Sequence, residues 1–71
     1  MARIPTVGEK YKYTYYSIMG LAKLIDIKVT GIYKLDNNKI IVRYKHNGFL
    51  FPIYEYVFLD EFNSNIAIEI N

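Results

Sequence analysis

The chain of 71 residues has no cysteine and no tryptophan, and only two prolines and four glycines. Without cysteine it can form neither a disulfide framework nor a thiolate metal site, which is typical of proteins from a reducing compartment. No apolar run approaches the roughly 20 residues that a transmembrane helix needs, and the N-terminus lacks the apolar core of a signal peptide. We therefore expect a cytoplasmic protein with no membrane partner.

Catalytic signatures are also missing. There is one histidine, His46, with no cysteine or paired carboxylate near it in the sequence, so we expect a residue at the surface beside a turn rather than a metal ligand. The carboxylates of Asp60 and Glu61 are adjacent, and neighbouring carboxylates usually point apart. No glycine-rich phosphate loop, metal motif or cofactor fingerprint is present. These absences predict a protein that is not an enzyme and has no cofactor.

What the chain does have is apolar and aromatic residues, which make up 52% and 17% of it. That content excludes a disordered chain. We expect one domain over residues 1–71, although a chain this short buries only about 60% of the surface that its unfolded form exposes. Its richness in Ile, Lys, Asn and Tyr is typical of AT-rich coding sequences, as in a phage, a low-GC bacterium or an archaeal mobile element.

The charge is unevenly distributed along the chain. Residues 1–46 hold all nine Lys and Arg against three acidic residues, a net +6, whereas residues 47–71 hold four acidic residues and no basic one, a net −4. Such asymmetry indicates either a nucleic-acid face with an acidic end, or two solvated faces that neutralise each other in the fold.

Alternation of apolar and polar residues predicts two strands in the first half of the chain. Residues 9–16 place Tyr11, Tyr13 and Tyr15 on one side, where core packing is a better explanation than a stacking strip. Residues 24–35 form the longest predicted strand. Residues 17–23 contain Gly20 without a clear period and favour a long loop over a helical turn.

Two turns predict the pairing of the central strands. Asn47-Gly48 favours a two-residue type I′ turn with φ > 0, which pairs Tyr44 with Phe51. A two-residue turn at Asn37-Asn38 pairs Tyr33 with Val42. Both turns place residues 40, 42 and 44 on one core face, and Gly31 then marks a bulge or makes room for the Tyr44 ring. Expected in the core are Ile25, Ile27, Val29, Tyr33, Val42, Tyr44 and Phe51; expected outside are Asp26, Lys28, Arg43 and Lys45.

The C-terminal third predicts a strand at an edge, a tight turn and a last strand. Pro52 cannot donate to a sheet ladder, so its strand lies at an edge or bends there. A 3₁₀ turn at residues 59–62 would bury Phe58 and Phe62. Residues 66–70 form a short strand with its isoleucines, Ile66, Ile68 and Ile70, facing inward. The fold class is therefore all-β, a small five-stranded antiparallel barrel with a short 3₁₀ turn before the last strand.

The order of these elements resembles the SH3-like small barrels. The lead-in Val7-Gly8-Glu9-Lys10, the long loop, the strand with Lys28-Val-Thr-Gly-Ile-Tyr33, the hairpin from Lys39-Ile-Ile-Val-Arg-Tyr44 and a turn before the last strand carry the resemblance. It covers most of residues 7–70. The resemblance implies a binding module that presents a sheet face or loop tips, as in short phage proteins and archaeal chromatin proteins of this shape.

The predicted outer face combines cations with apolar and aromatic side chains. Cations neutralise phosphates, and flat or apolar side chains stack on bases or wedge between them. The face comprises Lys28, Thr30, Ile32, Lys34, Lys39, Ile41, Arg43, Lys45 and Tyr54. We expect it to bind nucleic acid, namely double-stranded DNA with little sequence preference. An ordinary solvated face explains the same pattern. The alternative function is a protein-binding module, such as a phage or viral inhibitor or adaptor that docks on a host or viral protein. Self-association through an exposed strand edge is also open.

Overall fold

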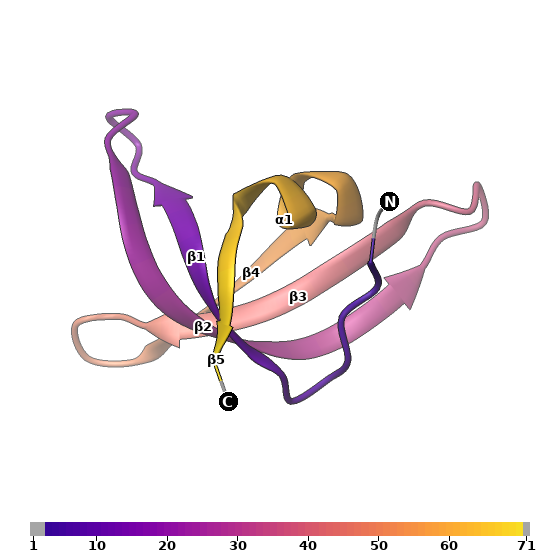
Figure 1. The fold of residues 1–71 in the computed structure, drawn as a ribbon, viewed down its shortest axis with the longest axis horizontal. Coiled ribbons are helices and arrows are strands. Elements are labelled where there is room, and N and C mark those ends of the chain that lie inside the picture. The colour runs from indigo at the N-terminus through magenta and orange to yellow at the C-terminus, as the bar shows by residue number, and fades with distance from the viewer. Residues whose placement is uncertain (1–2, 71) are drawn as a thin grey trace.

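The computed structural model describes residues 3–70 and shows five strands and one short helix (Figure 1). All strands pair antiparallel in one open sheet of order β4-β3-β2-β1-β5, so β4 and β5 are its edges. This confirms the five antiparallel strands, and it places Pro52 on an edge strand as predicted. Residues 1, 2 and 71 of the predicted domain lie outside the described residues. The elements are β1 (Lys10–Tyr16), β2 (Ala22–Lys34), β3 (Ile40–Asn47), β4 (Pro52–Phe58), α1 (Leu59–Asn65) and β5 (Ile66–Ile70).

The helix α1 lies over the inner side of the curved sheet (Figure 1), and the core between them contains a cluster of aromatic rings. Tyr11 and Tyr13 of β1 are each 2% exposed, which confirms the alternation read from the sequence. Phe62 of α1 is fully buried, with its ring centroid 5.7 Å from that of Tyr11, 5.5 Å from Tyr13 and 6.3 Å from Tyr44. Aromatic pairs at these separations are favourable beyond the area they bury. The other core residues are Ile27, Val29 and Val42.

The loop between β1 and β2 is shorter than predicted. The Ser17 amide donates to the Leu21 carbonyl at 3.0 Å, and the Gly20 amide donates to the Ser17 carbonyl at 2.8 Å. Gly20 has φ 79°, a conformation that glycine adopts without steric cost. The loop is therefore closed by its own backbone, and Ala22 and Lys23 belong to β2 rather than to a long loop.

The loop between β2 and β3 has three residues, so the predicted two-residue turn at Asn37-Asn38 is wrong. The Leu35 amide donates to the Lys39 carbonyl at 2.7 Å, which closes the loop around Asp36, Asn37 and Asn38. Asn38 carries the left-handed conformation, with φ 66°. One extra loop residue shifts the register by one, so Ile32 pairs with Val42 in place of Tyr33. A one-residue shift moves every side chain to the opposite face.

A bulge in β2 between Val29 and Gly31 then restores the predicted pattern further along the strand. Val29 lies opposite Tyr44, and both are buried as expected. Tyr33 was expected inside and is 41% exposed, because it lies on the loop side of the bulge. The bulge at Gly31 is confirmed, but the ring over it is that of Tyr33, whose hydroxyl would lie 2.6 Å from an added Cβ.

The loop between β3 and β4 spans residues 48–51, so the predicted two-residue turn at Asn47-Gly48 is also wrong. Asn47 pairs with Pro52, and the Gly48 amide donates to the Phe51 carbonyl at 3.0 Å. This register places Pro52, which has no N–H, at the end of the β3–β4 ladder. The predicted register would place Pro52 in the middle of the ladder, opposite Arg43. Phe51 was expected in the core and is 75% exposed in the loop.

The C-terminal segment differs from the prediction in three respects. The turn after β4 is an α-helix of seven residues rather than a 3₁₀ turn. Phe62 is buried as predicted, whereas Phe58 is half exposed, because it continues the alternation of β4 and points away from the core. Ile66 packs against the core, but an irregularity in the β1–β5 pairing places Ile68 opposite Lys12, where it is exposed.

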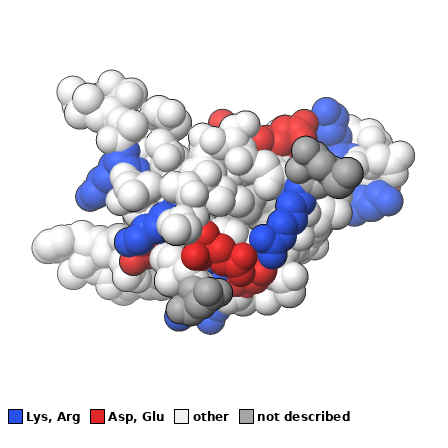
Figure 2. Space-filling model, viewed as in Figure 1, with Lys and Arg blue, Asp and Glu red and all other residues white. Residues whose placement is uncertain are grey.

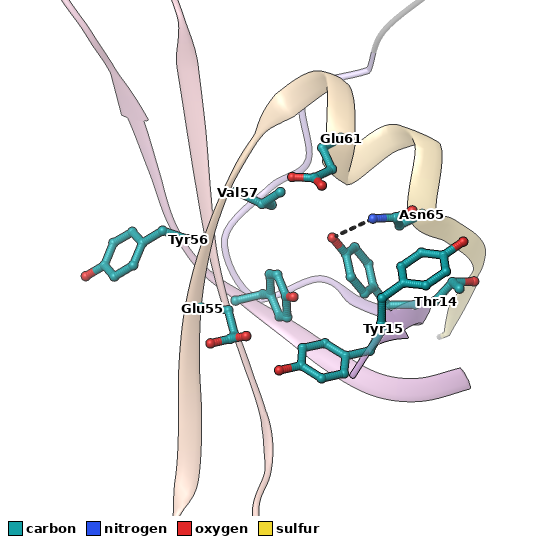
Figure 3. Close-up of a pocket in the computed structure, with 10 residues that line it drawn as sticks. Thr14, Tyr15, Glu55, Tyr56, Val57, Glu61 and Asn65 are labelled. Atoms are coloured by element: carbon teal, nitrogen blue, oxygen red, sulfur yellow. Dashed lines mark hydrogen bonds between the residues drawn. The ribbon is translucent and has the colours of Figure 1, made fainter. Parts of the chain in front are cut away.

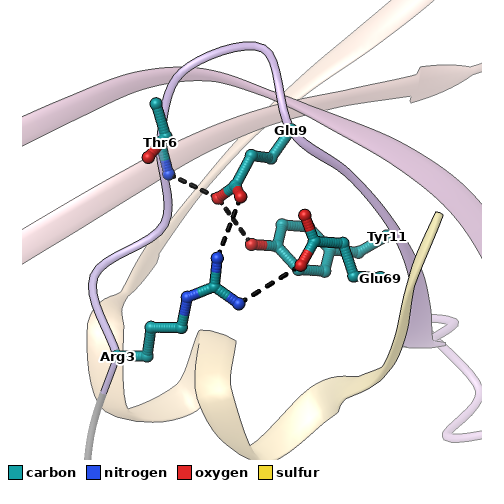
Figure 4. A network of polar contacts seen from close by, with 5 residues as sticks. All are labelled: Arg3, Thr6, Glu9, Tyr11 and Glu69. Carbon is teal, nitrogen blue, oxygen red and sulfur yellow. Dashed lines mark hydrogen bonds and ion pairs between the residues drawn. The ribbon is translucent and has the colours of Figure 1, made fainter. Parts of the chain in front are cut away.

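The N-terminal segment is tied to the start of β1 and to the edge strand β5 by one polar network (Figure 4). The Arg3 guanidinium contacts the Glu9 carboxylate at 2.9 Å and the Glu69 carboxylate of β5 at 3.2 Å. The Glu9 carboxylate also accepts from the Thr6 amide and from the Tyr11 hydroxyl. These donors, the Thr6 amide first, lower the pKa of Glu9. Glu69 therefore shares the positive charge of Arg3 with Glu9 and is not a free carboxylate.

Candidate nucleic-acid interface

The structure brings together most, but not all, of the residues predicted for the outer face. The register places one group on the side of β2, β3 and β4 that faces away from α1, and Lys39 lies just before β3 at the hairpin end. Ile32 and Lys34 are corrections: the three-residue loop turns both to the side of Val42, and Ile32 packs against the core. The residues that share the outer face are Lys28, Thr30, Ile41, Arg43, Lys45 and Tyr54.

Arg43 is at the centre of this face and is held by the bulge in β2. Its Nε donates to the Thr30 hydroxyl at 2.9 Å, and one terminal nitrogen donates to the Thr30 carbonyl at 3.1 Å. The Thr30 hydroxyl in turn donates to the Arg43 carbonyl at 3.2 Å. Arg43, which was expected to be exposed, is consequently half-buried, and Lys45, also expected to be exposed, is half-buried as well. The bulge thus fixes the position of one cation on the sheet.

Three tyrosines surround the Arg43 guanidinium. It lies 5.7 Å from the ring centroid of Tyr33 and 5.8 Å from that of Tyr54, within the range of a cation–π contact. The rings of Tyr33 and Tyr56 are 6.5 Å apart. A hydrogen-bonding Tyr56 side chain raises the pKa of Arg43 further above its usual value, so the guanidinium remains charged. All three rings keep exposed surface.

Two of these tyrosines are absent from the predicted site. Tyr56 lies on the outer face by simple alternation with Tyr54, so the pattern of β4 was sufficient to include it. Tyr33 was assigned to the core because a two-residue loop was assumed. The signal that would have placed it outside is Asn38, since asparagine tolerates the left-handed conformation required in the last position of a three-residue hairpin loop.

Lys28 and Lys45 add positive charge at one end of the face. They lie directly opposite each other in the β2–β3 pairing, an arrangement that is destabilising for like charges. Within residues 3–70, neither lysine takes part in an ion pair. From Lys28 onward the three strands contain one carboxylate, Glu55, which points to the other face, where it raises the pKa of Tyr15 by hydrogen bonding. Asp26, two residues before Lys28 on the same side of β2, is paired with Lys12, so the face carries a net positive charge.

Two other cations of residues 3–70 form ion pairs. Lys12 pairs with Asp26 across β1 and β2, and Arg3 pairs with Glu9 and Glu69. Blue and red atoms accordingly lie side by side in the middle of Figure 2. Among the described residues, the ion pair of Arg3 with Glu69 is the one that joins the basic part of the chain to the acidic part, so the charge asymmetry is cancelled only in part, and the Lys28 and Lys45 charges remain.

A hollow lies between β1, β4 and α1, on the other side of the sheet from the outer face (Figure 3). Tyr13, Tyr44, Glu55 and Glu61 contribute to its lining, and the Asn65 amide donates to the Tyr13 hydroxyl at 3.3 Å. Burial raises the pKa of Tyr44 and of Tyr13, so both phenols stay protonated at neutral pH. No lysine, arginine, histidine, serine or cysteine lines this hollow. Its two carboxylates would repel a nucleic acid.

Metal ligands do not gather anywhere among residues 3–70, where no group of three or more His, Asp or Glu side chains could hold an ion. His46 is half-buried against the rings of Tyr15 and Tyr44, at centroid distances of 5.1 and 6.2 Å, rather than at the surface as predicted. No helix in the described part of the chain is long and apolar enough to cross a membrane.

No family model matches the chain, and no curated protein or solved structure is significantly similar to it. The chemistry of the outer face is therefore the basis on which a function can be inferred.

Proposed function

We propose that this protein binds nucleic acid through the outer face of β2, β3 and β4, without acting as an enzyme and with little sequence preference. The observation that supports this is the combination of three cations, Lys28, Arg43 and Lys45, with exposed tyrosine rings on one face. The carboxylate on the same side of β2, Asp26, is paired with Lys12. Double-stranded DNA is the first candidate ligand, because uncompensated lysines bind phosphates of either strand regardless of sequence.

The residues of the face have different roles in this proposal. Lys28 and Lys45 neutralise phosphates, and a bound phosphate would relieve their mutual repulsion across the strand pair. Arg43 is held in place by Thr30, so its charge is presented without loss of side-chain freedom on binding. The neighbouring rings of Tyr54 and Tyr56 offer flat surfaces to sugars or bases.

An SH3-like fold is part of the proposal. It is supported by the strand order, in which β5 returns to pair with β1, and by the single short helix between β4 and β5. We also propose that the protein acts in the cytoplasm. In this view the three-stranded face β2-β3-β4 is the ligand-binding surface, and α1 fills the opposite side of the sheet through Phe62.

Single-stranded DNA or RNA is a second candidate, favoured by the three tyrosines around Arg43. Aromatic side chains on a sheet stack on unpaired bases, and each stacked base contributes about 1–3 kcal/mol. In a duplex the bases are already stacked, so the rings would contribute little there. Removal of a tyrosine should therefore weaken the binding of a single strand more than the binding of a duplex.

The test is fluorescence anisotropy with a labelled duplex and a labelled single strand over a range of salt concentrations. With three phosphate contacts, log K for the duplex should fall against log salt with a slope of about −3. Lys28→Gln with Lys45→Gln should flatten this slope by about two units. Lys34→Gln is the matched control, because Lys34 lies on the same strand but on the other face. Tyr54→Ala should weaken single-strand binding more than duplex binding.

Two results would contradict the proposal. Absence of binding to any nucleic acid at low salt would redirect attention to a protein partner docking on the same face, or to self-association through the β4 edge. A loss of affinity in the Lys34→Gln control equal to that of the Lys28 and Lys45 variant would mean that total charge, and not this face, determines binding.

A further inference from the structure

Two loops of the protein end in apolar tips that the nucleic-acid face does not use. Residues 16–22 and 46–54 contain no carboxylate, lysine or arginine. Ile18 and Phe49 are essentially fully exposed, and their apolar neighbours are each at least 67% exposed. Large apolar side chains presented to water in this way mark interaction sites. We call these residues the apolar tips: Ile18, Met19 and Leu21 in one loop, and Phe49, Leu50 and Phe51 in the other.

Both apolar tips lie at the same end of the molecule. In Figure 1 the β1–β2 loop and the β3–β4 loop project at the left, away from the β2–β3 loop at the right. One hollow lies among the strand residues at the base of both loops, and its lining includes Leu24, three residues after the first tip, and Asn47, which precedes the second loop. In Figure 2 both projections are white. A single surface can therefore contact both tips at once.

Positive charge surrounds the bases of the apolar tips. Lys23 follows the first tip in β2, and Lys45 precedes the second in β3. Lys45 also lines a hollow with Lys10, Lys28 and Asn47. The carboxylate of Asp26 in the same region is paired with Lys12. The end of the molecule that carries the tips is thus apolar at its extremities and basic behind them.

We propose that the apolar tips insert into the headgroup region of an anionic lipid bilayer, with Lys23 and Lys45 contacting the lipid phosphates. Side chains at an interface are buried about 5–10 Å deep, a depth suited to projecting loops, and basic residues behind them are attracted to anionic lipids. A bilayer deforms around two separate projections, whereas a protein partner would need two matching pockets. This revises the expectation of no membrane partner, which rested on the absence of a spanning segment.

Backbone hydrogen bonds close both of the loops that carry the apolar tips. The first loop is closed by the Ser17–Leu21 and Gly20–Ser17 hydrogen bonds, and the second by the bond from Gly48 to Phe51. Backbone N–H and C=O groups that hydrogen-bond within a loop already have a partner when they leave water for the membrane. The tips therefore present side chains at little cost in conformational entropy.

Vesicle co-sedimentation tests this proposal, with vesicles of phosphatidylcholine alone or with about one-third phosphatidylserine. The protein should sediment with the anionic vesicles and much less with the neutral ones. Phe49→Ser should lower the partition coefficient about tenfold, since it removes one inserted ring. Lys23→Gln should lower it about fivefold. The matched controls are Ile4→Ser, exposed but distant from the tips in sequence, and Lys34→Gln, at the opposite end of β2 from Lys23.

The outcomes are distinguishable from those of the nucleic-acid test, because neither Phe49 nor Lys23 belongs to the outer face. Equal binding of wild type and Phe49→Ser, or no sedimentation with anionic vesicles, would overturn the proposal. So would a concentration-dependent dimer in sedimentation velocity that Phe49→Ser abolishes, since the tips would then contact a second copy. A loss of vesicle binding in the tip and Lys23 variants alone, with the wild-type melting temperature retained, supports it.

Discussion

Replacement of Phe62 by alanine should remove most of the stability of this domain. A phenylalanine side chain buries roughly 150–200 Å², which at about 25 cal/mol/Å² corresponds to about 4–5 kcal/mol as an upper bound. Large-to-small substitutions of buried phenylalanine typically cost about 3–5 kcal/mol. Phe62 is fully buried and meets the rings of Tyr11, Tyr13 and Tyr44, so we expect about 3–4 kcal/mol. A domain of this size has a total stability on the order of 5 kcal/mol.

Urea denaturation followed by circular dichroism would measure this loss, and the melting temperature should fall by roughly 12–32 °C. Phe58→Ala is the matched control, because Phe58 lies four residues earlier, has the same side chain and is 52% exposed. It should cost no more than about 1 kcal/mol. Phe62→Leu should be intermediate, at about 1–2 kcal/mol, because it retains most of the buried volume. Equal costs for the two alanine variants would refute the placement of α1 over the sheet.

Three further predictions concern local conformation and pH. Asn38→Val puts a β-branched residue at φ 66° and should destabilise by about 1–2 kcal/mol, whereas Asn38→Gly should be close to neutral in the same urea assay. Gly31→Ala places a Cβ 2.8 Å from Tyr33 ring carbons; its cost of about 1 kcal/mol should disappear in a Tyr33→Ala background, and persistence of the cost would show a backbone cause. Burial, with hydrogen bonding to Glu9, raises the pKa of Tyr11 to about 12, and burial also raises the pKa of Tyr44, from an ordinary value of 10.0. Both phenols hold their protons more tightly in the folded state, so stability should be full below pH 10 and fall between about pH 10 and 12. Urea melts across that range should show this fall, and Tyr44→Phe should reduce it.

The sequence was sufficient to predict the strands and most of the core. Alternation in β1 and in the first half of β2 places Tyr11, Tyr13, Ile27 and Val29 inside, and the structure confirms each. These positions are predictable because a period of two is imposed by the strand itself and does not depend on the partner. Val42 was also placed correctly, since its neighbours in β3 alternate in the same way.

The loops could not be predicted to the residue, and the consequences of the two errors differ. The β3–β4 loop moved the register by four residues, an even number, so Arg43, Lys45 and Tyr54 stayed on the predicted face. The β2–β3 loop moved the β2–β3 register by one residue, so Ile32 lies opposite Val42 on the inner face and Tyr33 lies on the outer face. Loop length depends on backbone hydrogen bonds such as that between Leu35 and Lys39. Such bonds do not require particular side chains, so the sequence indicates them only weakly.

The bulge in β2 is what assembles the candidate site. Lys28 and Tyr33 are five residues apart, so in a regular strand they would lie on opposite faces. The irregularity between Val29 and Gly31 adds one residue to this stretch of β2, and both side chains then lie on the outer face. Arg43 holds the extra residue through three hydrogen bonds with Thr30, and its guanidinium lies against the Tyr33 ring that this residue turned outward. A bulge interrupts the hydrogen-bond ladder and weakens a sheet. The Arg43 side chain compensates for this loss with its hydrogen bonds to Thr30, and it also supplies the central cation of the face. Arg43 therefore links the stability of β2 to the chemistry of the face.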